Sequence, residues 1–152
     1  MTTDTRIIDR VFLDSSILFS TCQAEDGLNR LWKLAENGRC QLLTSRYVIE
    51  KAVRNLRHPY DLKPLEKCLP SVQIVLESDT RLRCPIELPE RARAVLMAAI
   101  SAKSDYFLTG DAEYYGRYLG ETIMGTKILS PRLYLSEKQL ANGAPNVKPF
   151  SH

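Results

Sequence analysis

Two aspartates stand directly after apolar runs that lie far apart in the chain. Asp14 follows Val11-Phe12-Leu13, and Asp111 closes the block Tyr106-Phe107-Leu108-Thr109-Gly110-Asp111. Each run has the length and composition of a short buried strand. Ligands of α/β domains gather outside the carboxyl ends of parallel strands, and carboxylates there hold divalent cations such as Mg²⁺. If the two strands meet in one sheet, the pair indicates a metal site that handles phosphodiesters.

The composition and charge of the chain argue against several kinds of functional site. Its 152 residues are 44% hydrophobic, which is enough for the core of one domain. A net charge of +3 permits a polyanionic partner without requiring one. The four cysteines are widely spaced and only two histidines occur, so we expect reduced thiols and neither a zinc site nor a Ser-His-Asp triad.

No signal-peptide core and no apolar run of membrane-spanning length occurs in the sequence. We therefore expect a cytoplasmic protein with no membrane partner.

Strands alternate with helices in the expected order of elements. Strands are predicted at 7–13, 40–44, 72–76, 106–109 and 127–129, with helices at 25–36, 46–56, 62–69 and, beginning at Pro89, over 92–102. This alternation predicts a three-layer α/β/α sandwich around a central, mainly parallel sheet. We expect a single domain over 1–135 and a loosely ordered tail over 136–152, where glycine, asparagine and proline recur.

Four stretches, taken together, resemble the PIN-domain family of nucleases, and in particular its bacterial, toxin-like members. The features are an aspartate ending the first strand, a helix that runs from Ser-x-Tyr to Arg-Asn-Leu, a Thr-Gly-Asp block and a closing Gly-Thr-Lys-Ile-Leu-Ser-Pro segment. They occupy residues 11–20, 45–56, 98–111 and 125–135. No single motif is specific, but their order and spacing cover nearly the whole chain.

The resemblance implies a cluster of acids that binds Mg²⁺ or Mn²⁺ and activates water to cut RNA. Asp14 matches the first acid of the family and Asp111 the last, so these two are the expected metal ligands. Ser16 and Thr109 match polar positions that support the acids or a metal-bound water.

Two other acid positions of the family depart from the pattern. Lys51 stands where a helical glutamate is expected, and Ala92 stands at the start of the later helix where an aspartate is expected. Glu50 is the nearest replacement for the first, although adjacent helical residues point about 100° apart. Glu90 is a poor replacement for the second. An active site would thus use Asp14, Glu50 and Asp111, and it would need a high metal concentration.

Several candidate residues also have a purely structural interpretation. Asp14 and Asp111 could be turn or capping residues. Tyr114 and Tyr115 could stack on an unpaired base, although packing against a helix is the more common role. Trp32 is expected in the core or at a dimer interface.

Basic residues occur in the segments that contain Lys51 and Ala92. They could contact a phosphate backbone without reading bases. A solvated basic face is the alternative. The residues assigned to nucleic-acid binding are Arg46, Lys51, Arg54 and Arg93.

Two functional hypotheses follow from the resemblance. The first is a metal-dependent endoribonuclease acting on single-stranded RNA, with a partly degraded acidic site, in the manner of a toxin with an antitoxin partner. The second is a catalytically inactive PIN-like module that binds RNA or a protein. Lys51 and Ala92 favour the second, and the Thr109-Gly110-Asp111 block favours the first. By analogy with the family, both hypotheses include a homodimer.

Overall fold

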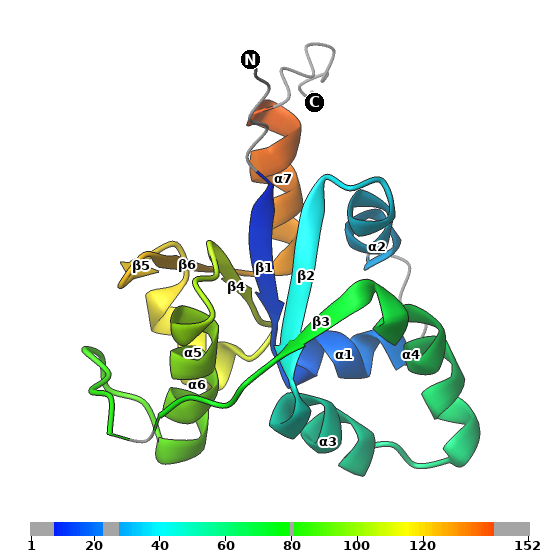
Figure 1. Ribbon diagram of the computed structural model, residues 1–152, viewed down its shortest axis with the longest axis horizontal. Helices are drawn as coiled ribbons and strands as arrows, with labels where there is room; N and C mark the ends of the chain where they lie inside the picture. Colours follow the sequence, from blue (N-terminus) through cyan, green and yellow to red (C-terminus); the bar gives the residue numbers. More distant parts are fainter. Residues whose placement is uncertain (1–7, 23–27, 80, 142–152) are drawn as a thin grey trace.

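A six-stranded sheet forms the centre of the molecule, and helices cover both of its faces (Figure 1). The computed structural model describes residues 8–22, 28–79 and 81–141. The strand order is β3-β2-β1-β4-β6-β5, and all neighbouring strands are parallel except the β5–β6 pair. This arrangement confirms the predicted three-layer α/β sandwich with a mainly parallel central sheet.

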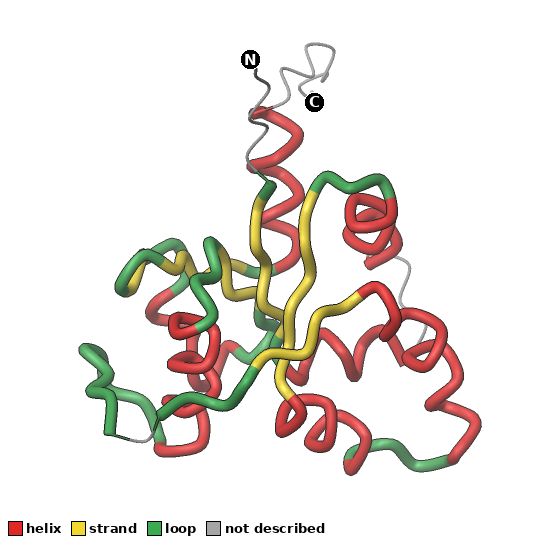
Figure 2. Tube along the Cα trace, viewed as in Figure 1, coloured by secondary structure: helices red, strands yellow, loops and turns green. Residues whose placement is uncertain are grey.

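The elements follow one another in the predicted alternation (Figure 2). The strands are β1 (Asp9–Leu13), β2 (Cys40–Ser45), β3 (Val72–Val75), β4 (Tyr106–Leu108), β5 (Thr122–Ile123) and β6 (Thr126–Leu129). The helices are α1 (Ser15–Cys22), α2 (Asn29–Glu36), α3 (Arg46–Arg54), α4 (Lys63–Cys68), α5 (Glu90–Ser101), α6 (Ala112–Tyr115) and α7 (Pro131–Ala141). Among the described residues, short 3₁₀ turns cover Pro59–Leu62, Leu69–Ser71 and Gly116–Tyr118. None of the helices in the described ranges is long and apolar enough to cross a membrane.

Aromatic contacts on the two faces of the sheet define the layers. Phe12 stacks on Phe107, and Phe107 packs against Tyr115 of α6, with ring centroids 5.8 and 5.0 Å apart. The neighbouring residue Tyr106 points to the opposite face and packs edge-on against Tyr134 of α7 at 4.9 Å. Because side chains alternate along a strand, α5 and α6 cover one face, whereas α1 to α4 and α7 cover the other (Figure 1).

Trp32 belongs to the core of the described structure. It is 8% exposed and lies in the same buried cluster as Leu28 and Leu31. Its indole N–H donates to the hydroxyl of Thr21 at 3.2 Å, so its polar atom is satisfied. A buried indole needs such a partner, and the core interpretation of this residue is therefore confirmed.

The structure differs from the sequence prediction at the ends of some elements and in three elements that were not predicted, α6, β5 and α7. Residue 7 and residues 25–27, assigned to the first strand and the first long helix, lie outside the described residues. The hairpin β5–β6 was not predicted. Its two-residue turn is Met124-Gly125, with φ angles of 51° and 91°. This is the twist that hairpins prefer, but methionine is an unusual first residue for it, so the turn left no clear signal.

The expectation of a loose tail from residue 136 is wrong as far as the described residues reach. Helix α7 continues through Ala141, and residues 142–152 of the expected tail lie outside the described part. The helix persists because Glu137 and Lys138 are held by partners on the sheet. Lys127 at the start of β6 pairs with Glu137 at 3.0 Å, and Asp9 at the start of β1 pairs with Lys138 at 2.8 Å.

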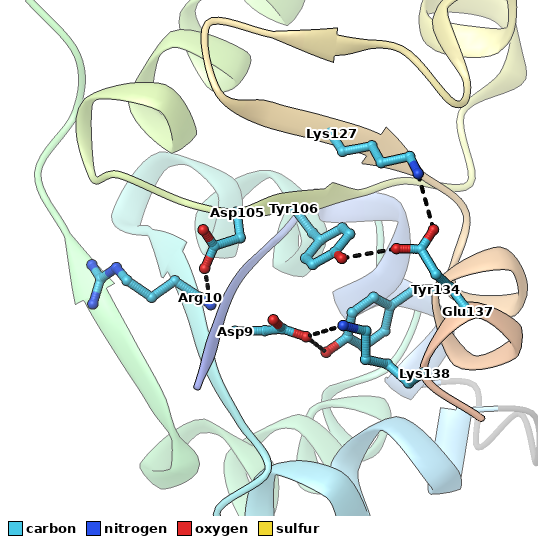
Figure 3. A network of polar contacts seen from close by, with 8 residues as sticks. All are labelled: Asp9, Arg10, Asp105, Tyr106, Lys127, Tyr134, Glu137 and Lys138. Carbon is cyan, nitrogen blue, oxygen red and sulfur yellow. Dashed lines mark hydrogen bonds and ion pairs between the residues drawn. The ribbon is translucent and has the colours of Figure 1, made fainter. Parts of the chain in front are cut away.

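These two ion pairs belong to a network at the amino end of the sheet (Figure 3). The buried Tyr134 donates its hydroxyl to Asp9 at 2.9 Å, and Tyr106 donates to Glu137 at 2.8 Å. The ammonium group of Lys138 also lies 5.1 Å from the centre of the Tyr106 ring. The network therefore anchors the last helix to the first, fourth and sixth strands.

Glu137 and Lys138 of this network are charged at neutral pH. Burial alone would raise the pKa of Glu137, but hydrogen bonds from Lys127 and Tyr106 outweigh it and hold that pKa below its ordinary value of 4.5. Burial would likewise lower the pKa of Lys138, but Asp9 outweighs it and the pKa is raised. The stabilisation from Glu137 is thus present above about pH 4.5 and is lost as the pH falls through its folded-state value.

We predict that Asp9→Ala destabilises the fold by about 1–3 kcal/mol, because it leaves the buried hydroxyl of Tyr134 and the ammonium of Lys138 without an acceptor. Asp79→Ala is the control, since it breaks the exposed pair of Asp79 with Arg81 and should have little effect. Urea unfolding followed by circular dichroism measures both. Equal losses in the two variants would contradict the anchoring role of Asp9.

Candidate functional site

The strand order brings the two predicted aspartates to one place. From β1 the chain proceeds to β2 and β3 on one side of the sheet and later returns to β4 and β6 on the other. The carboxyl ends of β1 and β4 are therefore the point at which the direction of winding reverses, where open α/β sheets bind ligands. Leu13 pairs with Leu108, and Asp14 donates its backbone N–H to the carbonyl of Leu108 at 3.0 Å.

Asp14 and Thr109 are joined directly. The hydroxyl of Thr109 donates to Oδ2 of Asp14 at 2.7 Å, and the two side chains are only 2% and 5% exposed, respectively. The backbone carbonyl of Asp14 also accepts the N–H groups of Ile17 and Leu18, which starts α1. Asp14 thus stands at the end of β1, as a site residue would, and its backbone also begins α1.

Burial raises the pKa of Asp14 above its ordinary value of 3.8. The hydrogen bonds from Thr109 and the N–H of Ser15, and the positive charge of Lys51, act in the opposite direction without cancelling it. The negative charge of Asp111 adds to the rise. Lys51 and Asp111 are therefore both near enough to Asp14 to act on its ionisation.

Asp111 follows Thr109 in the loop after β4, with Gly110 between them. Its backbone N–H donates to the hydroxyl of Thr109 at 3.0 Å, and its carboxylate accepts the N–H of Tyr114 at 3.1 Å. The second contact caps the short helix α6. Thr109 consequently links the two aspartates, since its hydroxyl donates to one and accepts from the backbone of the other.

Ser16 supports the loop that carries Asp111. Its hydroxyl accepts the N–H of Gly110 at 2.8 Å. The structure thus places Ser16 and Thr109 beside the aspartates, with Thr109 touching the Asp14 carboxylate and Ser16 holding the intervening backbone.

Helix α3 presents Lys51 rather than Glu50 to this site. The hydroxyl of Ser45 caps the helix by accepting the N–H of Val48 at 3.3 Å. Val48 and Ala52 are buried, which leaves Lys51 half-buried near Asp14 and Glu50 exposed. In the described ranges, no group of three or more His, Cys, Asp or Glu side chains is arranged to hold a metal ion. The predicted trio of Asp14, Glu50 and Asp111 is therefore not brought together.

Ala92 lies in the first turn of α5, where it contacts Tyr115 of α6. It is 4% exposed, and its carbonyl accepts the hydroxyl of Tyr115 at 2.9 Å. Burial, followed by the charges of Asp14 and Asp111, raises the pKa of Tyr115 well above its ordinary value. A methyl group thus occupies the position where the family resemblance expects an acid.

Two features of this region escaped the sequence analysis. The first is the Tyr115 hydroxyl, which is committed to the backbone of Ala92, so that Tyr115 packs in the core and does not face a base. The second is Thr44, a buried residue of β2 whose hydroxyl donates to the carbonyl of Leu13 at 2.9 Å. That bond fixes the end of β1 immediately before Asp14. A threonine near the end of a strand is too common to signal such a role.

The predicted basic residues lie on both sides of the sheet edge. Arg46 and Arg54 of α3 are exposed on one side, together with the half-buried Lys51. Arg93 of α5 is exposed on the other, where it lines a surface pocket with Arg117. Their positions suit contacts with a polyanion that crosses the carboxyl ends of the strands.

Comparison with known proteins supports the fold. No protein-family model and no curated protein matches the chain. The crystal structure of PAE2754 from Pyrobaculum aerophilum is similar over 89% of this chain and 99% of that chain, with 18% sequence identity and a TM-score of 0.56. At this identity the likeness defines a shared α/β fold and nothing of its activity.

We predict that Asp14→Asn raises the melting temperature at neutral pH by a few degrees. The pKa of Asp14 in the folded chain is raised above its ordinary value of 3.8. At pH values between these two pKa values, the folded chain therefore binds more protons than the unfolded chain. Stability therefore falls as the pH rises through this window. An asparagine avoids the loss, so its advantage should disappear toward pH 4.

Thr109→Val and Thr109→Ser provide the matched pair for this test. Valine removes the hydroxyl that donates to Asp14 and should cost about 1–3 kcal/mol at neutral pH, and less in acid. Serine keeps the hydroxyl and should cost less. Thermal unfolding across pH measures all three variants, and an Asp14→Asn protein that is less stable than the native chain at neutral pH would contradict the account.

Proposed function

We propose that the chain is a PIN-like domain that binds single-stranded RNA at the carboxyl edge of its sheet and no longer cleaves it. The observation that carries the proposal is that no third acid joins Asp14 and Asp111 in the described residues, and that α3 has Lys51 half-buried and Glu50 exposed. This arrangement keeps the fold and the polar frame of a nuclease site but changes its charge.

The loss of cleavage follows from what a divalent cation needs. Mg²⁺ and Mn²⁺ are held by several oxygen ligands, and carboxylates supply the charge that offsets their dehydration. Asp14 and Asp111 supply two, and both already accept hydrogen bonds, from Thr109 and from the α6 backbone. Two unit charges about 4 Å apart interact by about 4 kcal/mol at an effective dielectric of 20. A lysine ammonium at such a distance from a cation would oppose metal binding, and the positive charge of Lys51 already acts on the ionisation of Asp14.

Binding of RNA is supported by the cations that flank the same edge. Arg46 and Arg54 lie on one side and Arg93 on the other, all exposed. Arginines contact phosphate oxygens irrespective of base identity. The proposed activity is therefore binding with little sequence preference and strong dependence on salt.

A metal-dependent endoribonuclease is the second candidate function. It is favoured by the Asp14–Thr109–Asp111 arrangement, which places two acids and a hydroxyl at the winding reversal of the sheet. This candidate needs Glu50 to move from its exposed position toward the acids, and it includes the toxin role with an antitoxin partner.

Restoring the two absent acids should restore cleavage. We predict that Lys51→Glu combined with Ala92→Asp cuts labelled single-stranded RNA in Mn²⁺, whereas the native chain binds that RNA without cutting it. We expect Mn²⁺ affinity to rise more than about ten-fold, since about 1.4 kcal/mol of changed charge interaction is sufficient. Gel assays of cleavage and filter assays of binding measure both properties.

Further variants make the result specific. Asp14→Asn in the double variant should abolish the gained cleavage, and Glu50→Gln should not. Lys51→Glu alone is the second arm, because an acid at the buried Ala92 position can reduce folding, which circular dichroism will detect. Cleavage by the native chain that requires both Asp14 and Glu50 would establish the nuclease candidate instead.

A further inference from the structure

We propose that a groove between α1 and α7 binds the segment of single-stranded RNA that extends beyond the acidic edge. This inference rests on the RNA-binding function proposed above and adds a second contact region to it. The groove has a volume of about 600 Å³, within the roughly 300–1,000 Å³ typical of ligand-sized sites. It lies on the face of the sheet that is opposite to α5 and α6.

The groove combines an apolar floor with a basic rim. Ile17 and Leu28 are buried and Leu135 is half-buried, whereas Arg30 and Arg132 are exposed. The remaining described residues that line the groove are uncharged: Ser20, Gly110, Ser130, Pro131, Ser136 and Gln139. The apolar floor can cover part of a base through the hydrophobic effect, and arginines can bind the phosphates on either side of it.

The groove is continuous with the candidate site through Gly110. This residue lines the groove, and its N–H is held by the hydroxyl of Ser16 at 2.8 Å. It also lies between Thr109, which touches Asp14, and Asp111. An RNA strand that crosses the carboxyl ends of β1 and β4 therefore reaches the groove at Gly110.

Within the described ranges, the two arginines of the groove make no ion pair, whereas Lys138 of α7 does. Lys138, toward the end of the same helix, is paired with Asp9 at 2.8 Å. In contrast, Arg132 has no ion pair or hydrogen bond within the described ranges, and Arg30 makes one long hydrogen bond to Gln139 at 3.4 Å. Among the described lining residues, the charged ones are both arginines, and their charge is complementary to a polyanion.

The experiment compares the binding of a fluorescent oligouridine of about eight nucleotides, a length within the usual range of single-strand sites, to four proteins. Native chain, Arg132→Glu, Ser136→Trp and Arg39→Glu are titrated at several salt concentrations. Arg132→Glu removes a rim cation, and Ser136→Trp fills the groove without a change of charge. Arg39→Glu makes the same change of charge at an exposed position before β2, at the other end of the sheet.

We expect Arg132→Glu to weaken binding by about ten-fold or more and to reduce the slope of log K against log salt by about 0.7 for each lost phosphate contact. Ser136→Trp should weaken binding by a similar factor, and Arg39→Glu by much less. Native binding that neither groove variant weakens beyond Arg39→Glu overturns the groove and leaves the RNA-binding function intact. Absence of binding by the native chain overturns both. An acidic peptide that binds the groove variants weakly, while RNA binds them normally, would identify a protein ligand instead.

Discussion

One hydrogen bond, from the hydroxyl of Thr109 to the buried carboxylate of Asp14, holds together the part of the molecule on which the candidate site depends. It joins the carboxyl ends of β1 and β4, which neighbour each other only because the chain reverses its direction of winding between them. The same hydroxyl accepts the N–H of Asp111. A charged acceptor strengthens such a bond, and burial makes its loss costly. The position of both aspartates, and of the loop through Gly110, follows from this contact.

The carboxylates at the two ends of the sheet have different partners. At the amino end, Asp9 and Glu137 are each matched by a lysine and a tyrosine hydroxyl, and the result is a closed network that fixes α7. At the carboxyl end, Asp14 is buried against a neutral hydroxyl, and the cation that acts on it is Lys51 of α3. Lys51 and Ala92 stand where the family resemblance expects two acids, and the charge of Lys51 opposes the rise in the Asp14 pKa without cancelling it. Arg46, Arg54 and Arg93 are exposed on the helices beside this edge.

Much of this arrangement could be predicted from the sequence because it rests on patterns of short range. The apolar runs before Asp14 and Asp111 predict parallel strands, and the helical spacing around Lys51 separates it from Glu50. Other features depend on contacts between distant segments. Glu137 and Lys138 are held in a helix by Lys127 and Asp9, so polar composition alone predicted a loose tail there. The burial of the Tyr115 hydroxyl against Ala92 depends on how α5 and α6 pack, and the groove between α1 and α7 depends on residues from four separate segments.

The central claim is that the acid pair does not hold a metal ion in the native chain. Isothermal titration calorimetry with Mn²⁺, performed in parallel on the native chain and on Asp14→Asn, tests it most directly. The account predicts that neither protein gives a saturable heat and that the two traces coincide. A saturable binding signal in the native chain that Asp14→Asn abolishes would contradict it.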